Sequence, residues 1–167
     1  MSFRIGHGYD VHKFTSAKQN IIIGGVEIAY HLGLEAHSDG DVLIHALCDA
    51  ILGALGLGDI GKHFLDTDNQ FKNIDSKFFL AEIKKMLDEK QYSISNIDCT
   101  IIAQAPKMLP HIEKMRACLA NILEIQIKNR TVVGVDIGGT KVNAGRVCGE
   151  NLLDSYLSKI PPDAEHN

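Results

Sequence analysis

The stretch that most constrains this chain is residues 36–45, Ala-His-Ser-Asp-Gly-Asp-Val-Leu-Ile-His, which leads directly into an apolar pattern of helical period. Two histidines and two aspartates stand within this short stretch. Apolar side chains then recur every three or four positions, which predicts a helix over residues 41–55. His45 precedes Asp49 by one helical turn, so the two side chains project from the same face. The stretch therefore predicts a loop that brings polar side chains to the start of a buried helix.

A second short cluster lies near the N-terminus, where Asp10 and His12 flank Val11. Alternate residues of an extended strand point the same way, so Asp10 and His12 share a face. If this strand lies beside the start of the helix, one carboxylate and the imidazoles of His12 and His45 converge. Three protein ligands with an open fourth position are typical of a catalytic zinc site. The alternative is that these are ordinary polar residues at the ends of a strand and a helix, because one Asp-x-His pair is a weak motif.

Length and composition indicate one globular domain. The chain has 167 residues, of which 45% are hydrophobic and 23% charged. A net charge of -4 without a basic stripe argues against a nucleic-acid partner. The N-terminus lacks the apolar core of a signal peptide, and no apolar run is long enough to span a membrane. The cysteines are far apart, which favours a reduced, cytoplasmic chain over a zinc ribbon or a redox pair; they are Cys48, Cys99, Cys118 and Cys148.

Two extended segments are predicted before the first helix. Residues 3–12 predict a strand in which Gly6 and Gly8 permit close approach of the backbone to a ligand or another strand, or mark a bulge. Residues 21–29 predict a second extended segment that turns as a hairpin at Gly24 and Gly25.

Helices are predicted over residues 41–55, 75–91 and 110–123, with a well-patterned strand over residues 94–104 between the last two. Ser38 or Asp39 is expected to cap the first helix, and Asp75 or Ser76 the second. Glycines from Gly56 onward are expected to end the first helix and open a loop. The apolar stripes of the second and third helices are predicted to be Phe79, Leu80, Ile83, Met86 and Leu87, and Ile112, Met115, Leu119, Ile122 and Leu123.

Five longer motifs occur in order along the first part of the chain. They are Gly-His-Gly-Tyr-Asp-Val-His, Ile-Ile-Ile-Gly-Gly-Val, Ala-His-Ser-Asp-Gly-Asp-Val-Leu-Ile-His-Ala, Gly-Asp-Ile-Gly-Lys-His-Phe and Thr-Ile-Ile-Ala-Gln-Ala-Pro-Lys-Met-Leu-Pro-His. Together they resemble the family of 2-C-methyl-D-erythritol 2,4-cyclodiphosphate synthases, enzymes of the non-mevalonate isoprenoid pathway found in bacteria and plastids. Several long motifs in the correct order are far more specific than one short motif. The resemblance covers about residues 3–127 and defines a synthase-like domain over residues 1–127.

The resemblance implies an α/β subunit with helices on one face of a small sheet, assembled as a homotrimer. It also implies a CDP-linked small-molecule substrate, whose 2-phosphate attacks the β-phosphorus of its own CDP group and releases CMP. Such phosphoryl transfer needs positioning and charge neutralisation. In the family's pattern, Asp10, His12 and His45 would hold Zn²⁺ or another divalent transition metal, and Mg²⁺ would bind the substrate diphosphate.

Further roles are implied by position in the family's motifs. His37 matches a catalytic residue that helps to stabilise the transition state, and with Ser38 it matches a phosphate-contacting pair; Ser38 alternatively only caps the helix. Asp49 is either a partner of the metal-binding histidines or an exposed helix carboxylate. The full set of implied substrate-binding residues is Asp10, His12, His37, Ser38, Asp59, Ile60, Gly61, Phe64, Leu65, Asp66, Thr67, Asp68, Ala103, Gln104, Ala105, Pro106, Lys107, Met108 and Leu109. Those from Asp59 to Asp68 match loops around the methylerythritol part, and those from Ala103 to Leu109 match the cytidine pocket.

Residues 128–167 depart from the family's pattern, because no Thr-Thr-Glu motif follows residue 127. Residues 133–141, Val-Gly-Val-Asp-Ile-Gly-Gly-Thr-Lys, instead resemble the first phosphate loop of repressor/kinase (ROK) sugar kinases. We therefore interpret this tail as a foreign kinase-like segment that makes the chain chimeric. Its strands, residues 131–137 and 141–147, are expected to form a β-hairpin in place of the family's own terminal strands, and residues 161–167 are expected to be disordered.

Three functions remain open on sequence grounds. The first is the cyclodiphosphate synthase, a phosphorus-oxygen lyase. The second is a metal- and nucleotide-binding trimer whose catalysis is impaired by the missing threonine motif. The third, a fragment of a sugar kinase, lacks the second lobe and the catalytic aspartate that such a kinase needs.

Overall fold

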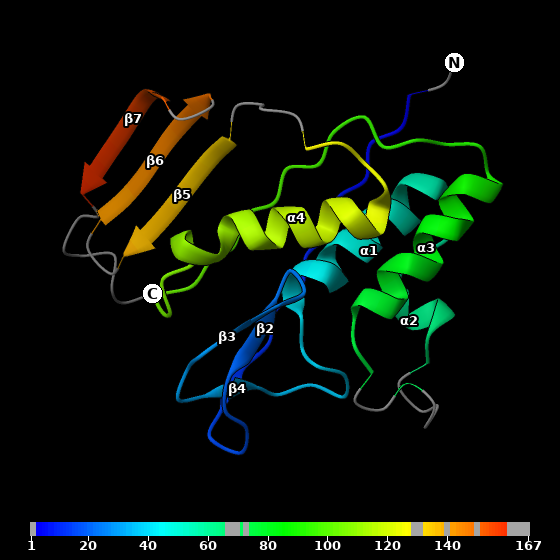
Figure 1. Cartoon of the computed structure of the whole chain (residues 1–167), viewed down its shortest axis with the longest axis horizontal. Helices are drawn as coiled ribbons and strands as arrows, with labels where there is room; N and C mark the ends of the chain where they lie inside the picture. The colour runs from blue at the N-terminus through cyan, green and yellow to red at the C-terminus, as the bar shows by residue number, and fades with distance from the viewer. Residues whose placement is uncertain are drawn as a thin grey trace. The chain divides into compact units, whose positions relative to one another are not determined.

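The computed structural model of the chain describes residues 3–65, 71 and 74–127, together with the backbone of three strands within residues 132–159. The chain divides into two compact units, which are residues 1–95 with 111–126 and residues 96–110 with 127–167 (Figure 1). None of the helices in the described part is long and apolar enough to cross a membrane.

A short hairpin forms early in the first unit, as the sequence predicts. Strand β2 (Ile21–Ile23) pairs antiparallel with β3 (Val26–Ile28), with Ile23 opposite Val26. Gly24 and Gly25 form the turn with φ of 59° and 73°, a conformation that other residues rarely adopt. Both of their N–H groups donate to the buried carboxylate of Asp41. The hairpin turn is therefore held at the start of the following helix.

Helix α1 (Val42–Leu55) forms the centre of the first unit. Asp41 caps it by accepting from Ile44 N at 3.0 Å, and Gly56 ends it in the left-handed conformation. The predicted cap at Ser38 or Asp39 is wrong, because the helix begins at Val42 and the capping side chain must stand directly before it. The helix buries seven apolar side chains, which are Leu43, Ile44, Leu47, Cys48, Ile51, Leu52 and Leu55.

One helical turn, α2 (Ile60–His63), lies inside the segment that the sequence predicts as a loop. Asp59 caps it by accepting from Lys62 N, and Asp49 of α1 accepts from Ile60 N at 2.8 Å. Asp49 therefore fastens α2 to α1. The sequence analysis considers Asp49 as a partner of the metal-binding histidines or as an exposed helix carboxylate. Among the described residues its contact is a different one, with the backbone of α2.

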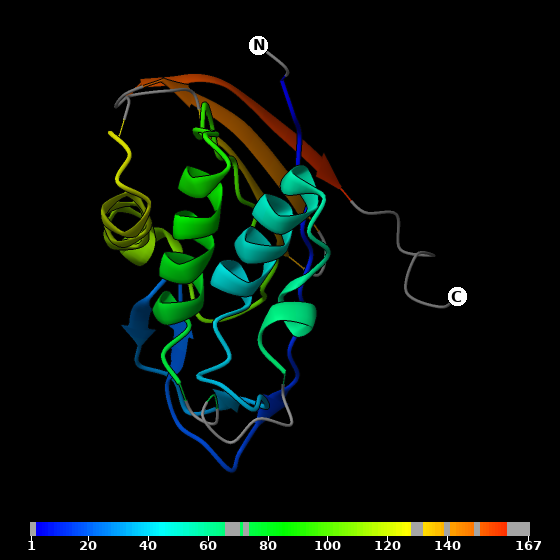
Figure 2. The same ribbon diagram turned by 90° about the vertical axis from the view of Figure 1, so that its right-hand side faces the viewer.

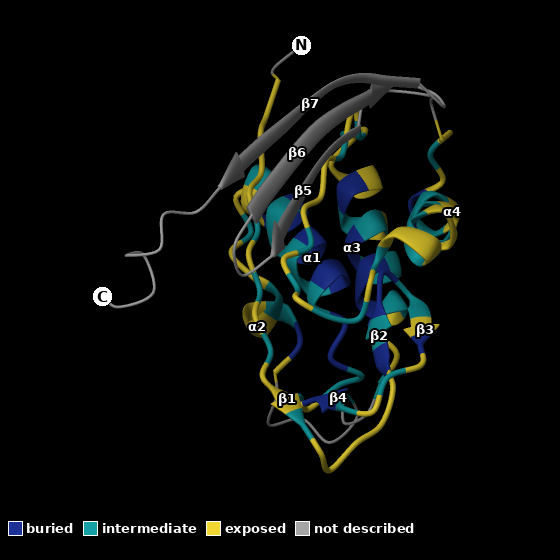
Figure 3. Ribbon diagram, turned by 90° about the vertical axis from the view of Figure 1, so that its left-hand side faces the viewer, coloured by how far each residue is buried: buried dark blue, intermediate teal, exposed yellow. Residues whose placement is uncertain are grey.

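Helices α3 (Lys77–Glu89) and α4 (Ile112–Leu123) complete the helical layer, and a 3-10 turn, η2 (Leu109–His111), precedes α4. Helix α3 lies beside α1 and packs against it, with α4 on the other side of α3 (Figure 2). The inward faces of α1 and α3 are buried, whereas much of α4 is exposed (Figure 3). Of the stripe predicted for α4, Met115 and Leu123 are buried and the other three side chains are half-buried.

Two predicted strands are absent from the described residues. Residues 3–12 run without a hydrogen-bonded ladder, and the first strand is instead β1 (Phe14–Thr15), which pairs with β4 (Gly33–Leu34). Residues 94–104 also form no strand, and Ile102 is 70% exposed. An alternating pattern supplies a face, but a strand also needs a neighbour for its N–H and C=O groups. The expected small sheet is therefore replaced in the first unit by two separate two-stranded sheets.

The second unit contains a three-stranded antiparallel sheet in the order β5 (Val132–Gly138), β6 (Lys141–Cys148) and β7 (Asn151–Lys159). The pairing of β5 with β6 falls on the hairpin predicted for residues 131–147, and β7 adds a strand that the sequence analysis did not predict. The predicted disorder of residues 161–167 concerns a segment outside the described residues.

Candidate metal centre

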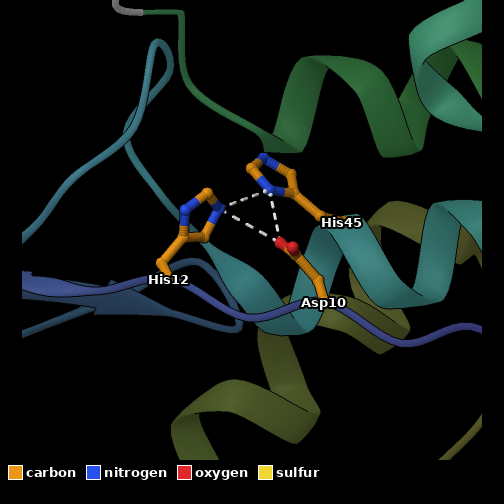
Figure 4. Close-up of side chains that lie close together, drawn as sticks. All are labelled: Asp10, His12 and His45. Atoms are coloured by element: carbon orange, nitrogen blue, oxygen red, sulfur yellow. Dashed lines mark hydrogen bonds and ion pairs between the residues drawn. The ribbon is translucent and has the colours of Figure 1, made fainter.

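Asp10, His12 and His45 meet at one point, as the sequence predicts (Figure 4). The Asp10 carboxylate lies 3.1 Å from His12 Nε2 and 3.0 Å from His45 Nδ1. The two imidazole nitrogens are 3.4 Å apart. One ligand atom from each residue therefore lies within 4.8 Å of the others, which is the spacing of groups that could share one metal ion.

The orientation of His12 is set by a backbone carbonyl. Its Nδ1 lies 2.9 Å from Glu35 O. A carbonyl oxygen only accepts, so Nδ1 carries the proton and donates it. The lone pair of neutral His12 is consequently on Nε2, the atom that faces Asp10 and His45.

The orientation of His45 is set by hydroxyl groups. Its Nε2 lies 2.8 Å from Ser76 Oγ and 3.2 Å from Ser38 Oγ. The opposite ring nitrogen, Nδ1, faces Asp10 and His12. His45 thus presents Nδ1 to the centre and is hydrogen-bonded from behind.

Electrostatics couples the three residues. Burial alone would raise the pKa of Asp10, but hydrogen bonds from His12 and His45 and the charge of their rings hold that pKa well below its ordinary value of 3.8. The hydrogen bond to Asp10 raises the pKa of His12 above its ordinary value of 6.5. Asp10 and His12 therefore stabilise each other's charged forms.

The segment that carries Asp10 and His12, residues 3–13, is named here the N-terminal arm. The backbone of the arm lies directly on α1, where a Cβ at Gly6 or Gly8 would collide with the carbonyl groups of Ala50 or Ala46. The close approach predicted for these glycines is therefore correct, but the neighbour is a helix. Arg4 adds a hydrogen bond to Ala54 O at 3.1 Å and lies over the ring of Tyr92.

The donor set fits a transition metal. Two neutral imidazole nitrogens and one carboxylate oxygen are ligands that Zn²⁺ accepts readily, whereas Mg²⁺ and Ca²⁺ prefer oxygen alone. Because each imidazole has its second nitrogen hydrogen-bonded elsewhere, both rings are oriented before a metal binds.

The other predicted site residues are placed as follows. His37 is exposed on the loop before α1, and Ser38 lies behind His45. Residues 59–61 lie at the start of α2, Phe64 is buried among phenylalanines, and Leu65 is 57% exposed. Asp66, Thr67 and Asp68 lie outside the described residues. Residues 103–109 belong to the second unit, and their predicted role in holding cytidine stays a prediction.

Sequence reasoning missed two direct partners of His12 and His45 and a third group that holds one of these partners. These are the carbonyl of Glu35, the hydroxyl of Ser76, and the carboxylate of Asp39, which accepts from the Ser76 hydroxyl and from Ser76 N. The sequence predicts Asp39 and Ser76 only as helix caps. No local signal distinguishes a serine that supports a histidine from one that caps a helix.

Known proteins are similar to this chain over most of its length. Residues 3–145 match the model of the YgbB family. The chain is 99% identical over 127 residues to the 2-C-methyl-D-erythritol 2,4-cyclodiphosphate synthase of Francisella tularensis subsp. holarctica (strain OSU18), covering 76% of this chain and 80% of that protein. It is 55% identical over 148 residues to the synthase of Haemophilus ducreyi (strain 35000HP / ATCC 700724), and the match covers 87% of this chain and 92% of that protein.

The fold has solved counterparts as well. A structure of 2C-methyl-D-erythritol-2,4-cyclodiphosphate synthase in a CDP-bound form superposes with a TM-score of 0.69 at 33% identity, covering 74% of this chain and 81% of that one. The α/β arrangement of small sheets and helices is therefore one that such synthases share.

Proposed function

The chain belongs to the YgbB family, and on that premise we propose that it converts 4-diphosphocytidyl-2-C-methyl-D-erythritol 2-phosphate into the cyclic diphosphate and CMP. It is an enzyme of isoprenoid biosynthesis and a phosphorus-oxygen lyase. In the reaction an oxygen of the 2-phosphate bonds to the β-phosphorus, and the bond from that phosphorus to the bridging oxygen of CMP breaks. The product retains both phosphoryl groups and CMP carries away the electron pair.

The observation that carries the metal assignment is the convergence of Asp10 Oδ2, His12 Nε2 and His45 Nδ1. We assign Zn²⁺, or another divalent transition metal, to these atoms and Mg²⁺ to the substrate diphosphate. Bound there, such cations supply Lewis-acid charge neutralisation for the phosphoryl oxygens. The protein itself contributes three ligand atoms in fixed positions, because the rings of His12 and His45 are oriented before a metal binds.

The other residues that match the family's motifs bind and orient the substrate. His37 and Ser38 stand on the loop that enters α1 and contact phosphate, with His37 stabilising the transition state. Residues 59–61 and 64–68 hold the methylerythritol part, and residues 103–109 hold the cytidine. Support for these roles comes from the matching motifs and from the position of Ser38 beside His45.

The active enzyme is a cytoplasmic homotrimer. Support for assembly comes from the N-terminal arm, where Phe3, Ile5, Tyr9 and Val11 are each at least 70% exposed. Large apolar side chains on one segment are typical of a surface that another copy covers. Analytical ultracentrifugation checks this, because a monomer at working concentrations would contradict it.

The tail, residues 128–167, is a kinase-like segment joined to a synthase domain of residues 1–127. The boundary is supported by the 99% identity, which extends over 127 residues and leaves one fifth of the Francisella protein unmatched. The kinase-like character is supported by the motif of residues 133–141 alone. The family match to residue 145 and the 148-residue match to the Haemophilus protein count against a break at residue 127. Replacing residues 128–167 by the unmatched segment of the Francisella protein tests whether the tail is foreign. If it is foreign, CMP release should become faster after the exchange. If it is native-like, the rate should not change.

The activity is tested by CMP release from the substrate with Zn²⁺ and Mg²⁺ present, with His45→Ala as the matched control. We expect release by the wild type and none above background by the variant. A folded, zinc-loaded wild type that releases no CMP would show a metal- and nucleotide-binding protein whose chemistry has been lost.

A further inference from the structure

Behind His45 lie two residues that are not among the candidate metal ligands, Ser76 and Asp39. Ser76 Oγ is 2.8 Å from His45 Nε2 and is hydrogen-bonded to Asp39 Oδ1. The second oxygen of the same carboxylate accepts from Ser76 N at 3.0 Å. Ser76 is completely buried. The carboxylate of Asp39 thus holds both the backbone and the hydroxyl of the residue that contacts His45.

The positions of the hydrogen atoms follow from the acceptors. An ionised carboxylate only accepts, so the single hydroxyl proton of Ser76 points to Asp39. The Ser76 oxygen can then only accept from His45, which places the ring proton on Nε2. That leaves the lone pair of neutral His45 on Nδ1, the atom that faces Asp10 and His12.

The hydroxyl of Ser76 does not cap α3, although a serine directly before a helix usually does. Ser76 stands at the N-cap of α3, yet its side chain makes no capping hydrogen bond to the helix. A cap of this type is worth about 0.5–2 kcal/mol to a helix. The hydroxyl is directed instead to His45 and Asp39, so its observed contacts do not include helix capping.

We propose that Asp39 and Ser76 are positioning residues of the metal centre, which fix His45 with its proton on Nε2 and so keep Nδ1 free for a divalent metal. This inference rests on the proposed metal role of Asp10, His12 and His45. Metal-binding histidines commonly depend on such a partner, and losing it costs roughly 10- to 100-fold in metal affinity.

Asp39→Asn is the most selective substitution, because it changes the hydrogen-bonding groups of the side chain and keeps its size. An amide presents one acceptor and one donor where the carboxylate presents two acceptors. If its NH₂ group donates to Ser76 Oγ, the serine proton turns toward His45 Nε2 and favours the proton on Nδ1, where it competes with the metal. Asp75→Asn is the matched control, since the Asp75 side chain contacts Lys77 and does not contact His45.

Two measurements test the proposal. The first is the Kd for Zn²⁺ alone, by competition with a chromophoric chelator, for the wild type, Ser76→Ala, Ser76→Thr, Asp39→Asn and Asp75→Asn. We expect Ser76→Ala and Asp39→Asn to bind roughly 10- to 100-fold more weakly. Ser76→Thr, which keeps the hydroxyl, and Asp75→Asn should stay close to the wild type.

The second is the NMR signal of the His45 Nε2–H proton in the zinc-loaded wild type. It should be shifted downfield and protected from solvent exchange, and it should lose that protection in Ser76→Ala. This signal decides the matter even if a variant fails to fold, because an unprotected or absent proton in the wild type overturns the proposal.

The outcomes separate this proposal from the one on which it rests. A folded wild type that does not bind Zn²⁺ removes the proposed metal centre and this inference with it. A wild type that binds Zn²⁺, together with a folded Ser76→Ala that binds as tightly, overturns the positioning role alone. Loss of folding stability in Ser76→Ala with unchanged zinc affinity would likewise show that the pair only joins two loops.

Discussion

The two halves of the metal centre are built on very different supports. His45 stands on α1, where the neighbouring Ile44 and Cys48 are completely buried. Asp10 and His12 stand on the N-terminal arm, where Ile5 and Val11 are 82% and 70% exposed. The arm makes no ladder among the described residues, and its backbone contacts α1 at Gly6 and Gly8.

This difference teaches how the site is assembled. The helix is fixed by burial of apolar side chains, which depends little on the ligands it carries. The arm is fixed by close backbone contact, by Arg4 and by the side chains of the site itself. Changes in the helix core should therefore act on folding, and changes in the arm should act on metal binding and activity.

The largest effect is expected from Leu52→Ala in α1, where Leu52 is completely buried. Removing a buried leucine side chain leaves a cavity, and we expect a loss of about 2–5 kcal/mol in the free energy of unfolding, measured by urea denaturation. Lys13→Ala on the arm is the control, because the Lys13 side chain is exposed and stands apart from the apolar surface assigned to the homotrimer; it should change stability by less than about 0.5 kcal/mol. A comparable loss at Lys13 would break the comparison, because the arm would then contribute to folding as much as the helix does.

Gly8→Ala tests the arm directly. The added Cβ would lie well inside 3.0 Å of the Ala46 carbonyl, so the arm must move away from α1 and carry Asp10 and His12 with it. A displacement of about 1 Å is enough to cost on the order of 100-fold in the rate of CMP release. The variant should still fold. Wild-type turnover by Gly8→Ala would show that the position of the arm is not set by its contact with the helix.

The pH dependence of zinc affinity tests the arm through His12. Its pKa is raised above 6.5 by Asp10, so the protonated ring stabilises the metal-free fold fully below pH 6.5, and this contribution is lost as the pH rises through the raised pKa. A metal needs the neutral ring, so affinity runs the other way and should fall about tenfold for each pH unit below that pKa. Chelator competition across this range measures the effect. A decline that begins only below pH 6.5 would contradict the coupling to Asp10.

The smallest effect is expected from Gly53→Ala, which also serves as the control for Gly8→Ala. A Cβ at Gly53 meets no atom within 4 Å, and the residue lies inside α1. Alanine is the better helix former, so the free energy of unfolding should rise by about 0.5–1 kcal/mol, with zinc affinity unchanged. A loss of stability would mean that this exposed face of α1 is covered in the native protein.

The sequence predicted the elements whose signals are local. The turn at Gly24 and Gly25 needs positive φ, and α1 follows from its apolar period and the glycine at its end. The predicted strand over residues 94–104 failed because its alternating pattern says nothing about whether a neighbouring strand is present. The predicted cap of α1 was wrong by two or three residues. Ser38, Asp39 and Asp41 stand close together before Val42, and each has a side chain of the kind that caps helices.

By itself the sequence determined which donor groups the candidate metal centre offers, because a carboxylate and two imidazoles are present at Asp10, His12 and His45 whatever their surroundings. The tertiary structure decided which nitrogen of each ring faces the centre. That choice depends on Glu35, Ser76 and Asp39, which are remote from one or both histidines along the chain. A hydrogen bond between distant residues leaves no periodic or local trace in a sequence, because it exists only once folding has placed its donor and acceptor within about 3 Å of each other.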